Sequence, residues 1–234
     1  SKHTILANLS PQQGGFQQNL GCIMTFFILR ESIYFAREYS SQLYVCFLDC
    51  RQAFDRVWTQ GMFYKLLDNN IDDTSFIAIT EMYKNVTSSV KYKGFISESF
   101  PIQQGTRQGG KSSPLLYLLY INELIKELES SRLGMCMYNV DLCSPTVADD
   151  MVLVSFSKSG LDQMLALRYN YAMKWRFEYN AATCAVFICN SPDKGHSEHS
   201  FHMDQQQIDI VDQYTHLGIT CDKYVSTHLL IQEA

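Results

Sequence analysis

The chain has 234 residues, 46% of them hydrophobic and 18% charged, which is enough to bury one sizeable core. A formal net charge of −5 argues against a protein that binds nucleic acid unaided, because phosphate contacts need Lys and Arg. The sequence shows neither an apolar stretch of membrane-spanning length nor a basic start followed by an apolar run, so we expect no membrane span and no signal peptide.

The chain contains eight cysteines, and none of them forms a CxxC pair. Several lie inside apolar runs, as Cys46 does. Free buried thiols in a reducing compartment therefore fit the sequence better than a disulfide framework or a zinc site.

In the first half of the chain, apolar spacing predicts a helix over residues 19–39 and a buried strand over 43–48 that ends at Asp49. It then predicts helices over 60–68 and 73–84, the second capped by Asp72 or Asp73. A hairpin formed by residues 87–92 and 98–103 is expected to turn near Lys93 and Gly94.

The second half begins with a long apolar helix over residues 110–128. A hairpin over 146–156 is expected to carry Asp149 and Asp150 at its tip. The remaining predicted elements are a helix over 161–177, a strand over 183–189, a hairpin over 201–211 and a strand over 214–220. Antiparallel strand pairs separated by helices indicate the α+β class.

Acidic residues at strand ends are the strongest chemical feature. Asp49 ends one apolar run, and Asp149 and Asp150 precede another. A charge at the end of a buried strand is costly unless it is paired or bound to a metal ion. Three carboxylates on neighbouring strands would suit Mg²⁺, and two such ions can promote an in-line phosphoryl displacement. The alternative reading is a set of turn or capping aspartates.

The residues around these acids carry a family resemblance. FLDCRQAFDRVW (47–58), QGTRQGGKSSPLLYLLYINEL (104–124) and VADDMVL (147–153) resemble motifs A, B and C of reverse transcriptases. YNAATCAVF (179–187) and YTHLGIT (214–220) resemble motifs D and E, and GGFQQNLGC (14–22) resembles the segment before the first fingers helix. The chain is thus similar to reverse transcriptases of non-LTR retrotransposons, most of all to jockey-like elements.

The resemblance implies a right-hand polymerase palm, an antiparallel sheet with helices on one face, together with partial fingers. The expected fingers parts are about 1–40 and 60–104, and the expected palm parts are about 41–59 and 105–220. It also implies that a thumb should follow Thr220 and that the chain is cut short at both ends. The implied reaction is RNA-directed DNA synthesis from a primer 3′-hydroxyl, inside the cell, in the nucleus or cytoplasm. Its partners are an RNA template, a DNA primer and dNTPs.

Carried onto this chain, the resemblance assigns the two catalytic Mg²⁺ ions, with Mn²⁺ able to substitute, to Asp49 and Asp149. Asp150 supports that site, and the backbone carbonyl of Cys50 is a further metal ligand. Phe54 is the implied steric gate that excludes a ribose 2′-hydroxyl. The motif B pair contacts the incoming nucleotide and its template partner, and consists here of Gln108 and Gly109.

Several positions depart from the family pattern. Thr183 stands where motif D carries a Lys that protonates the leaving pyrophosphate, and losing a general acid typically slows a reaction about 10²- to 10⁴-fold. Val147 replaces the usual Tyr of motif C. Two rival interpretations therefore remain: a catalytically dead, truncated retroelement remnant that at most binds nucleic acid, and a palm-fold nucleotidyltransferase that needs no template.

Overall fold

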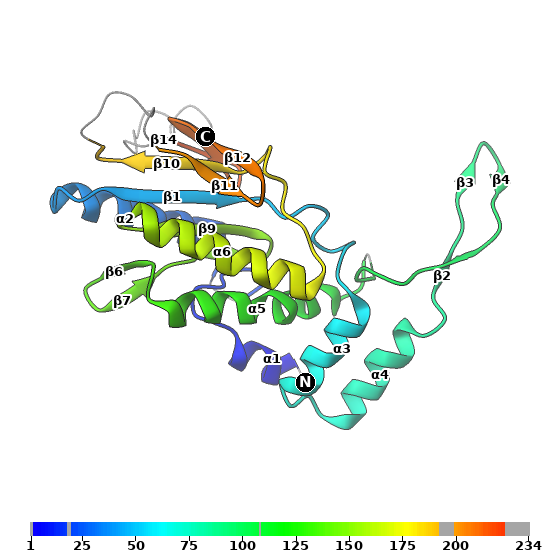
Figure 1. Ribbon diagram of the computed structural model, residues 1–234. Helices are drawn as coiled ribbons and strands as arrows, with labels where there is room; N and C mark the ends of the chain where they lie inside the picture. The colour runs from blue at the N-terminus through cyan, green and yellow to red at the C-terminus, as the bar shows by residue number, and fades with distance from the viewer. Residues whose placement is uncertain (1, 18–19, 108, 192–198, 223–234) are drawn as a thin grey trace.

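The structure is a computed structural model that describes residues 2–17, 20–107, 109–191 and 199–222 (Figure 1). Its centre is a six-stranded sheet with the strand order β11-β12-β10-β1-β9-β8. The strands are β1 (Leu43–Leu48), β8 (Thr146–Val147), β9 (Asp150–Ser155), β10 (Ala185–Cys189), β11 (Phe201–Met203) and β12 (Gln206–Ile210). Strand β1 lies between β9 and β10 and pairs antiparallel with both.

The sheet is mixed rather than purely antiparallel, because β10 and β12 run parallel. This corrects the expected sheet in one pair of strands. The sequence pattern predicted the strands but could not show which of them pair. All the other neighbouring strands of the sheet are antiparallel, as expected.

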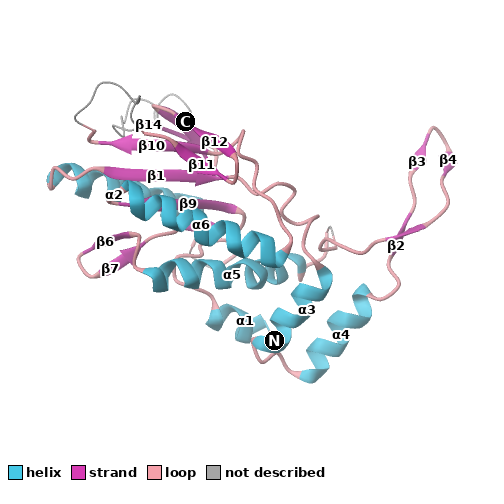
Figure 2. Ribbon diagram, viewed as in Figure 1, coloured by secondary structure: helices cyan, strands magenta, loops and turns pink. Residues whose placement is uncertain are grey.

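Helices cover both faces of the sheet, so the expectation of helices on one face is wrong (Figure 2). Helices α5 (Ser113–Ser131) and α6 (Lys158–Trp175) pack on one face with Cys46 and Leu48. Helix α2 (Cys22–Glu38) packs on the other with Val45 and Phe47. Strand β1 reads as a continuous apolar run because both of its faces are buried.

The predicted helices lie within three residues of the observed ones. Helix α3 (Thr59–Asp68) precedes α4 (Asp73–Tyr83), and the Asp72 side chain accepts a hydrogen bond from the Ser75 backbone N–H, as a capping residue does. No helix in the described ranges combines the length and apolar character needed to cross a membrane. All eight cysteines are free thiols, as expected.

The chain between α4 and α5 forms a projecting arm, which we define as residues 87–101 (Figure 1). Its strands are β2 (Thr87–Ser88), β3 (Lys91–Tyr92), β4 (Phe95–Ile96) and β5 (Phe100–Pro101). The arm turns at Lys93 and Gly94, where the sequence predicted a turn, and both residues have positive φ.

Three elements were not predicted. Helix α1 (Lys2–Asn8) packs on α5, and β6 (Met135–Met137) pairs with β7 (Val140–Leu142). The single strand expected over residues 214–220 is a hairpin of β13 (Gln213–His216) and β14 (Ile219–Asp222). Leu217 and Gly218 form its turn with positive φ.

Candidate active site

The acidic hairpin forms as the sequence predicts. Val147 and Asp150 are the last paired residues of β8 and β9, so only Ala148 and Asp149 connect the two strands. Ala148 has a left-handed backbone with φ of 56°, which is uncommon for a residue with a side chain. The turn places Asp149 at its tip and Asp150 at the first position of β9.

Asp49 lies beside this hairpin. Leu48 pairs with Met151 in the β1–β9 register, so the next residues along the two strands are Asp49 and Asp150. The topology therefore brings all three predicted carboxylates to one end of the two central strands. The sequence placed each acid at a strand end, and the pairing of β1 with β9 makes these ends neighbours.

Burial and mutual repulsion make these carboxylates hard to ionise. Burial raises the pKa of Asp149, and the nearby Asp49 raises it further. Burial, followed by the charges of Asp149 and Asp49, raises the pKa of Asp150 to about 6. A bound cation would offset both causes, because it favours the charged form of each acid. Three oxygen donors also match the hard ligands that Mg²⁺ takes.

The acids are nevertheless not arranged as a finished metal cage. In the part of the chain that the structure describes, no three His, Cys, Asp or Glu side chains are grouped so that they could hold a metal ion. One oxygen of Asp49, Oδ2, instead accepts a hydrogen bond of 2.6 Å from the Thr183 hydroxyl. The donor set fits Mg²⁺ in its chemistry and its place in the fold, and the side chains would have to converge on the ion.

Cys50 could contribute only through its backbone. Its side chain is buried, and burial raises the pKa of the thiol to about 12, so the sulfur stays protonated. A neutral thiol is a poor ligand for Mg²⁺, whereas a carbonyl oxygen is a suitable one.

Phe54 lies next to this end of the sheet and is held by other aromatic rings. Its ring centroid is 4.6 Å from that of Tyr117 on α5 and 6.4 Å from that of Phe16. The loop that carries Phe54 is fixed by the chain before α5, because the Thr106 N–H donates to the Phe54 carbonyl over 2.7 Å. Gly105 approaches the same loop so closely that a Cβ there would lie 2.9 Å from the Asp55 carbonyl oxygen.

The motif B residues begin beside this loop. Gly109 has φ of 76°, a conformation that glycine adopts without strain. Gly109, Phe54 and Arg107 line a cavity of about 560 Å³, where a nucleotide could lie against the expected gate. Gln108, the other predicted contact, lies outside the described residues. Helix α5 begins at Ser113 with Pro114 in its first turn, as the sequence predicts.

Strand β13 supports Asp49 from the other side. The Tyr214 ring stacks on Phe47 with a centroid distance of 4.6 Å, and its hydroxyl donates to the Thr183 carbonyl over 2.7 Å. Thr183 is thus fixed by Tyr214 and bonded to Asp49 at once. The sequence singled out both Thr183 and Tyr214 but did not predict their contact.

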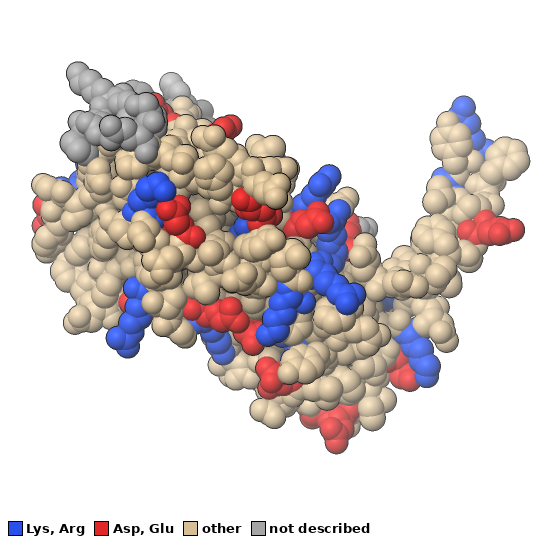
Figure 3. Space-filling model, viewed as in Figure 1, with Lys and Arg blue, Asp and Glu red and all other residues tan. Residues whose placement is uncertain are grey.

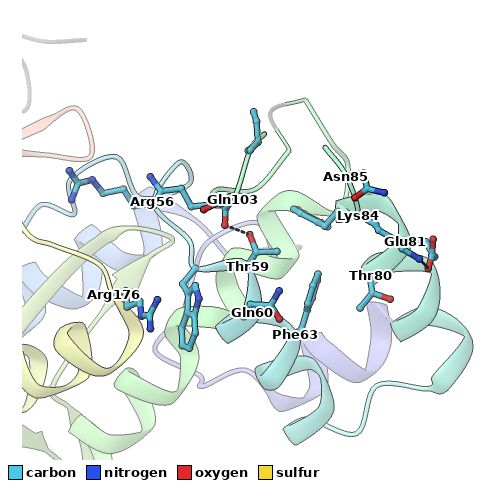
Figure 4. Close-up of a pocket in the computed structure, with 14 residues that line it drawn as sticks. Arg56, Thr59, Gln60, Phe63, Thr80, Glu81, Lys84, Asn85, Gln103 and Arg176 are labelled. Atoms are coloured by element: carbon cyan, nitrogen blue, oxygen red, sulfur yellow. Dashed lines mark hydrogen bonds and ion pairs between the residues drawn. The ribbon is translucent and has the colours of Figure 1, made fainter. Parts of the chain in front are cut away.

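A larger cavity, of about 820 Å³, lies between α3, α4 and residues 102–104 (Figure 4). Two arginines from distant parts of the chain line it: Arg56 pairs with Glu178 at 2.6 Å, and Arg176 lies 4.1 Å from the centre of the Trp58 ring. The sequence analysis missed both arginines, because only the fold brings the chain after β1 next to the end of α6.

Comparison with known proteins agrees with this arrangement. A family model described as reverse transcriptase (RNA-dependent DNA polymerase) matches residues 2–221. The chain is 29% identical over 198 residues to the RNA-directed DNA polymerase from mobile element jockey of Drosophila melanogaster, covering 80% of this chain and 21% of that protein.

The chain is also 25% identical over 219 residues to the Pol polyprotein from the type-2 retrotransposable element R2DM of Drosophila melanogaster, covering 91% of this chain and 21% of that protein. It therefore spans about a fifth of the length of these two relatives.

A solved structure with the same fold is the apo telomerase of Candida tropicalis truncated from its C-terminal domain. The TM-score is 0.65 at 14% identity, over 94% of this chain and 42% of that one. This likeness confirms the polymerase palm fold. With the acidic hairpin beside Asp49 and a family match across almost the whole length, the chain belongs to the reverse transcriptase family.

Proposed function

We propose that this chain is the polymerase core of a non-LTR retrotransposon and that it extends a DNA primer on an RNA template. The observation that carries the proposal is the meeting of Asp49, Asp149 and Asp150 at one end of β1 and β9. The family match and the two retrotransposon relatives support it. The proposed place of action is inside the cell, where the RNA template and the chromosomal primer occur.

In the proposed mechanism, Asp49 and Asp149 hold two Mg²⁺ ions, with the Cys50 carbonyl as a further ligand and Asp150 as a supporting acid. Bound there, the ions would supply activation of the primer hydroxyl and stabilisation of the leaving oxygen. Mn²⁺ would substitute in the same oxygen site. Thr183 keeps Asp49 in place before binding, through its hydrogen bond to Oδ2.

The incoming dNTP would lie in the cavity beside Phe54. A ring clamped between Tyr117 and Phe16 cannot easily move aside for a 2′-hydroxyl, so the pocket would favour deoxynucleotides. Gly109 leaves room for close approach to the backbone, and Gln108 would contact the nucleotide. We keep the division into fingers (about 1–40 and 60–104) and palm (about 41–59 and 105–220) as part of this proposal.

Primer extension on an RNA template with Mg²⁺ and dNTPs tests the proposal. The unsubstituted chain should add nucleotides that the template specifies, and Asp149→Ala should add none that can be detected. The matched control is Asp162→Ala, which removes an exposed aspartate on α6 that pairs only with Lys158. It should extend the primer normally.

Two outcomes would favour the rival functions. Failure of the unsubstituted chain to extend any primer, even with Mn²⁺ and excess protein, would support the inactive remnant. Nucleotide transfer that ignores the template sequence would support a template-independent nucleotidyltransferase instead.

A further inference from the structure

The segment between α1 and α2 extends the sheet at its β8 edge. Gln13 forms a parallel bridge with Thr146, which lies in β8 just before the acidic turn. The Thr146 N–H donates to the Gln12 carbonyl over 2.9 Å, and the Gly14 N–H donates to the Thr146 carbonyl over 2.7 Å. These residues therefore run beside the strand that leads to Asp149.

The Gln13 side chain reaches the turn itself. It is fully buried, and its Oε1 accepts hydrogen bonds from the Ala148 N–H over 2.9 Å and from the Gly15 N–H over 2.8 Å. Ala148 has the left-handed backbone of the turn and directly precedes Asp149. A left-handed alanine is strained, so the surrounding contacts must hold it there.

We propose that Gln13 is a positioning residue that fixes the Ala148 peptide and thereby aims the Asp149 carboxylate toward the metal site. The proposal rests on the proposed function, in which Asp149 binds a catalytic ion. Gln13 touches neither metal nor substrate and acts only through the turn. Hydrogen-bond partners of this kind, one step removed from a ligand, typically affect metal affinity or activity about 10- to 100-fold.

The choice of glutamine favours this role over simple packing. Its Nε2 is buried and has no hydrogen-bond partner among the described residues, which costs free energy. An apolar side chain of equal size would fill the same space without that cost. What glutamine adds is the oxygen that accepts from Ala148.

The surroundings of Gln13 are built for this contact. A Cβ on Gly15 would lie 2.6 Å from the Ala148 nitrogen and 2.8 Å from Gln13 Oε1, so only glycine leaves room for the side chain. On the other side, Ser10 anchors the segment to α5: its N–H donates to Asn122 Oδ1 over 2.8 Å, and its hydroxyl donates to Glu129 Oε1 over 2.6 Å.

The test compares Gln13→Met, which keeps the size but loses the acceptor, with the unsubstituted chain. Hydrogen exchange of the Ala148 amide, followed by NMR with alanine-selective labelling, should become at least about tenfold faster. The Mg²⁺ concentration for half-maximal primer extension should rise about tenfold or more. Gln13→Glu, which keeps an oxygen at the same distance, should restore slow exchange.

The control is Ser10→Ala, which removes a buried contact of the same segment to α5 but none to the turn. It should lower the melting temperature and leave the Mg²⁺ requirement unchanged. If Gln13→Met does not fold, Gly15→Ala disturbs the same contact from the backbone side and should raise the Mg²⁺ requirement likewise. An unchanged Ala148 exchange rate and an unchanged Mg²⁺ requirement in the folded variant would overturn the proposal.

The failure of this proposal can be told apart from failure of the proposed function. If Asp149→Ala still extends primers, the assignment of Asp149 is wrong, whatever Gln13 does. If Asp149→Ala is inactive while Gln13→Met behaves like the unsubstituted chain, only the role of Gln13 is wrong.

Discussion

Phe54 is the residue at which sugar choice can be tested separately from catalysis. Its ring is clamped by Tyr117 and Phe16, so truncation would open the space that a 2′-hydroxyl needs. Phe54→Ala should raise the use of ribonucleotides relative to deoxynucleotides at least about tenfold, measured as the ratio of kcat/KM values. Phe35→Ala removes a clustered ring on α2 and should leave that ratio unchanged. An unaltered ratio in Phe54→Ala would contradict the gate.

Asp150 should make the metal-free protein sensitive to pH. Its pKa in the folded chain, about 6, lies above the ordinary 3.8, so ionisation is harder in the folded state. The stability that the protonated acid contributes is present below pH 4 and is lost as pH rises toward 6. The melting temperature of the unsubstituted chain in a chelator should therefore fall, relative to that of Asp150→Asn, between pH 4 and 6. A constant difference between the two chains would contradict this.

At the scale of elements, Lys65 joins three helices. Its ammonium on α3 is almost fully buried, contacts Glu123 on α5, donates to the Tyr171 hydroxyl over 2.8 Å and lies 3.8 Å from the Trp175 ring centre. Lys65→Ala would leave a cavity, and we expect the free energy of unfolding to fall by about 3 kcal/mol.

Lys65→Met is the matched variant, because it fills the same space without the charge. The Glu123 side chain is 39% exposed, so water can solvate it once its partner is gone. The loss of stability in denaturant titrations should then stay below about 1.5 kcal/mol. Equal losses in the two variants would show that the ion pair, and not the packing, joins the helices.

Elements with a local signal could be predicted from the sequence. The apolar run of β1 and the acidic hairpin of β8 and β9 are visible because burial and turn formation depend on neighbouring residues. Helix α1 and the β6–β7 hairpin were missed, since both are short. The β6–β7 hairpin also turns at Tyr138 and Asn139 with positive φ, although tyrosine gives no turn signal.

The candidate site was predictable in its acids but not in its supports. Asp49, Asp149 and Asp150 each follow or begin a strand, and the motif resemblance linked them. The contacts of Gln13 with Ala148 and of Thr183 with Asp49 join residues more than 130 positions apart in sequence. Only the pairing of strands reveals such contacts, because neither residue has a distinctive neighbourhood in the sequence.

At the scale of the whole molecule, positive charge is unevenly placed. The arm projects away from the sheet and carries Lys91 and Lys93 beside the exposed Tyr92 and Phe95 (Figure 3). Basic and aromatic side chains together can bind single-stranded nucleic acid by phosphate contacts and stacking. A chain with a net charge of −5 would need such local positive sites to hold a template.

Replacing residues 90–97 with a two-residue Asn-Gly turn tests the arm, whose tip packs on nothing else in Figure 1. The melting temperature should change little, whereas RNA binding should weaken. Its dependence on log salt concentration should become shallower by about one to two units, because each lost phosphate contact removes about 0.9. Lys126→Gln on α5 is the control for a lost exposed charge. An unchanged salt dependence would remove the arm from the binding surface.

The most direct measurement is Mn²⁺ binding, followed by electron paramagnetic resonance, in the complex of this chain with primer, template and dNTP. Two ions should bind to the unsubstituted chain, and Asp49→Asn and Asp149→Asn should each weaken binding at least about tenfold, because each removes a charged oxygen ligand. Mn²⁺ binding that is the same in all three chains would contradict a two-metal site at the end of β1 and β9.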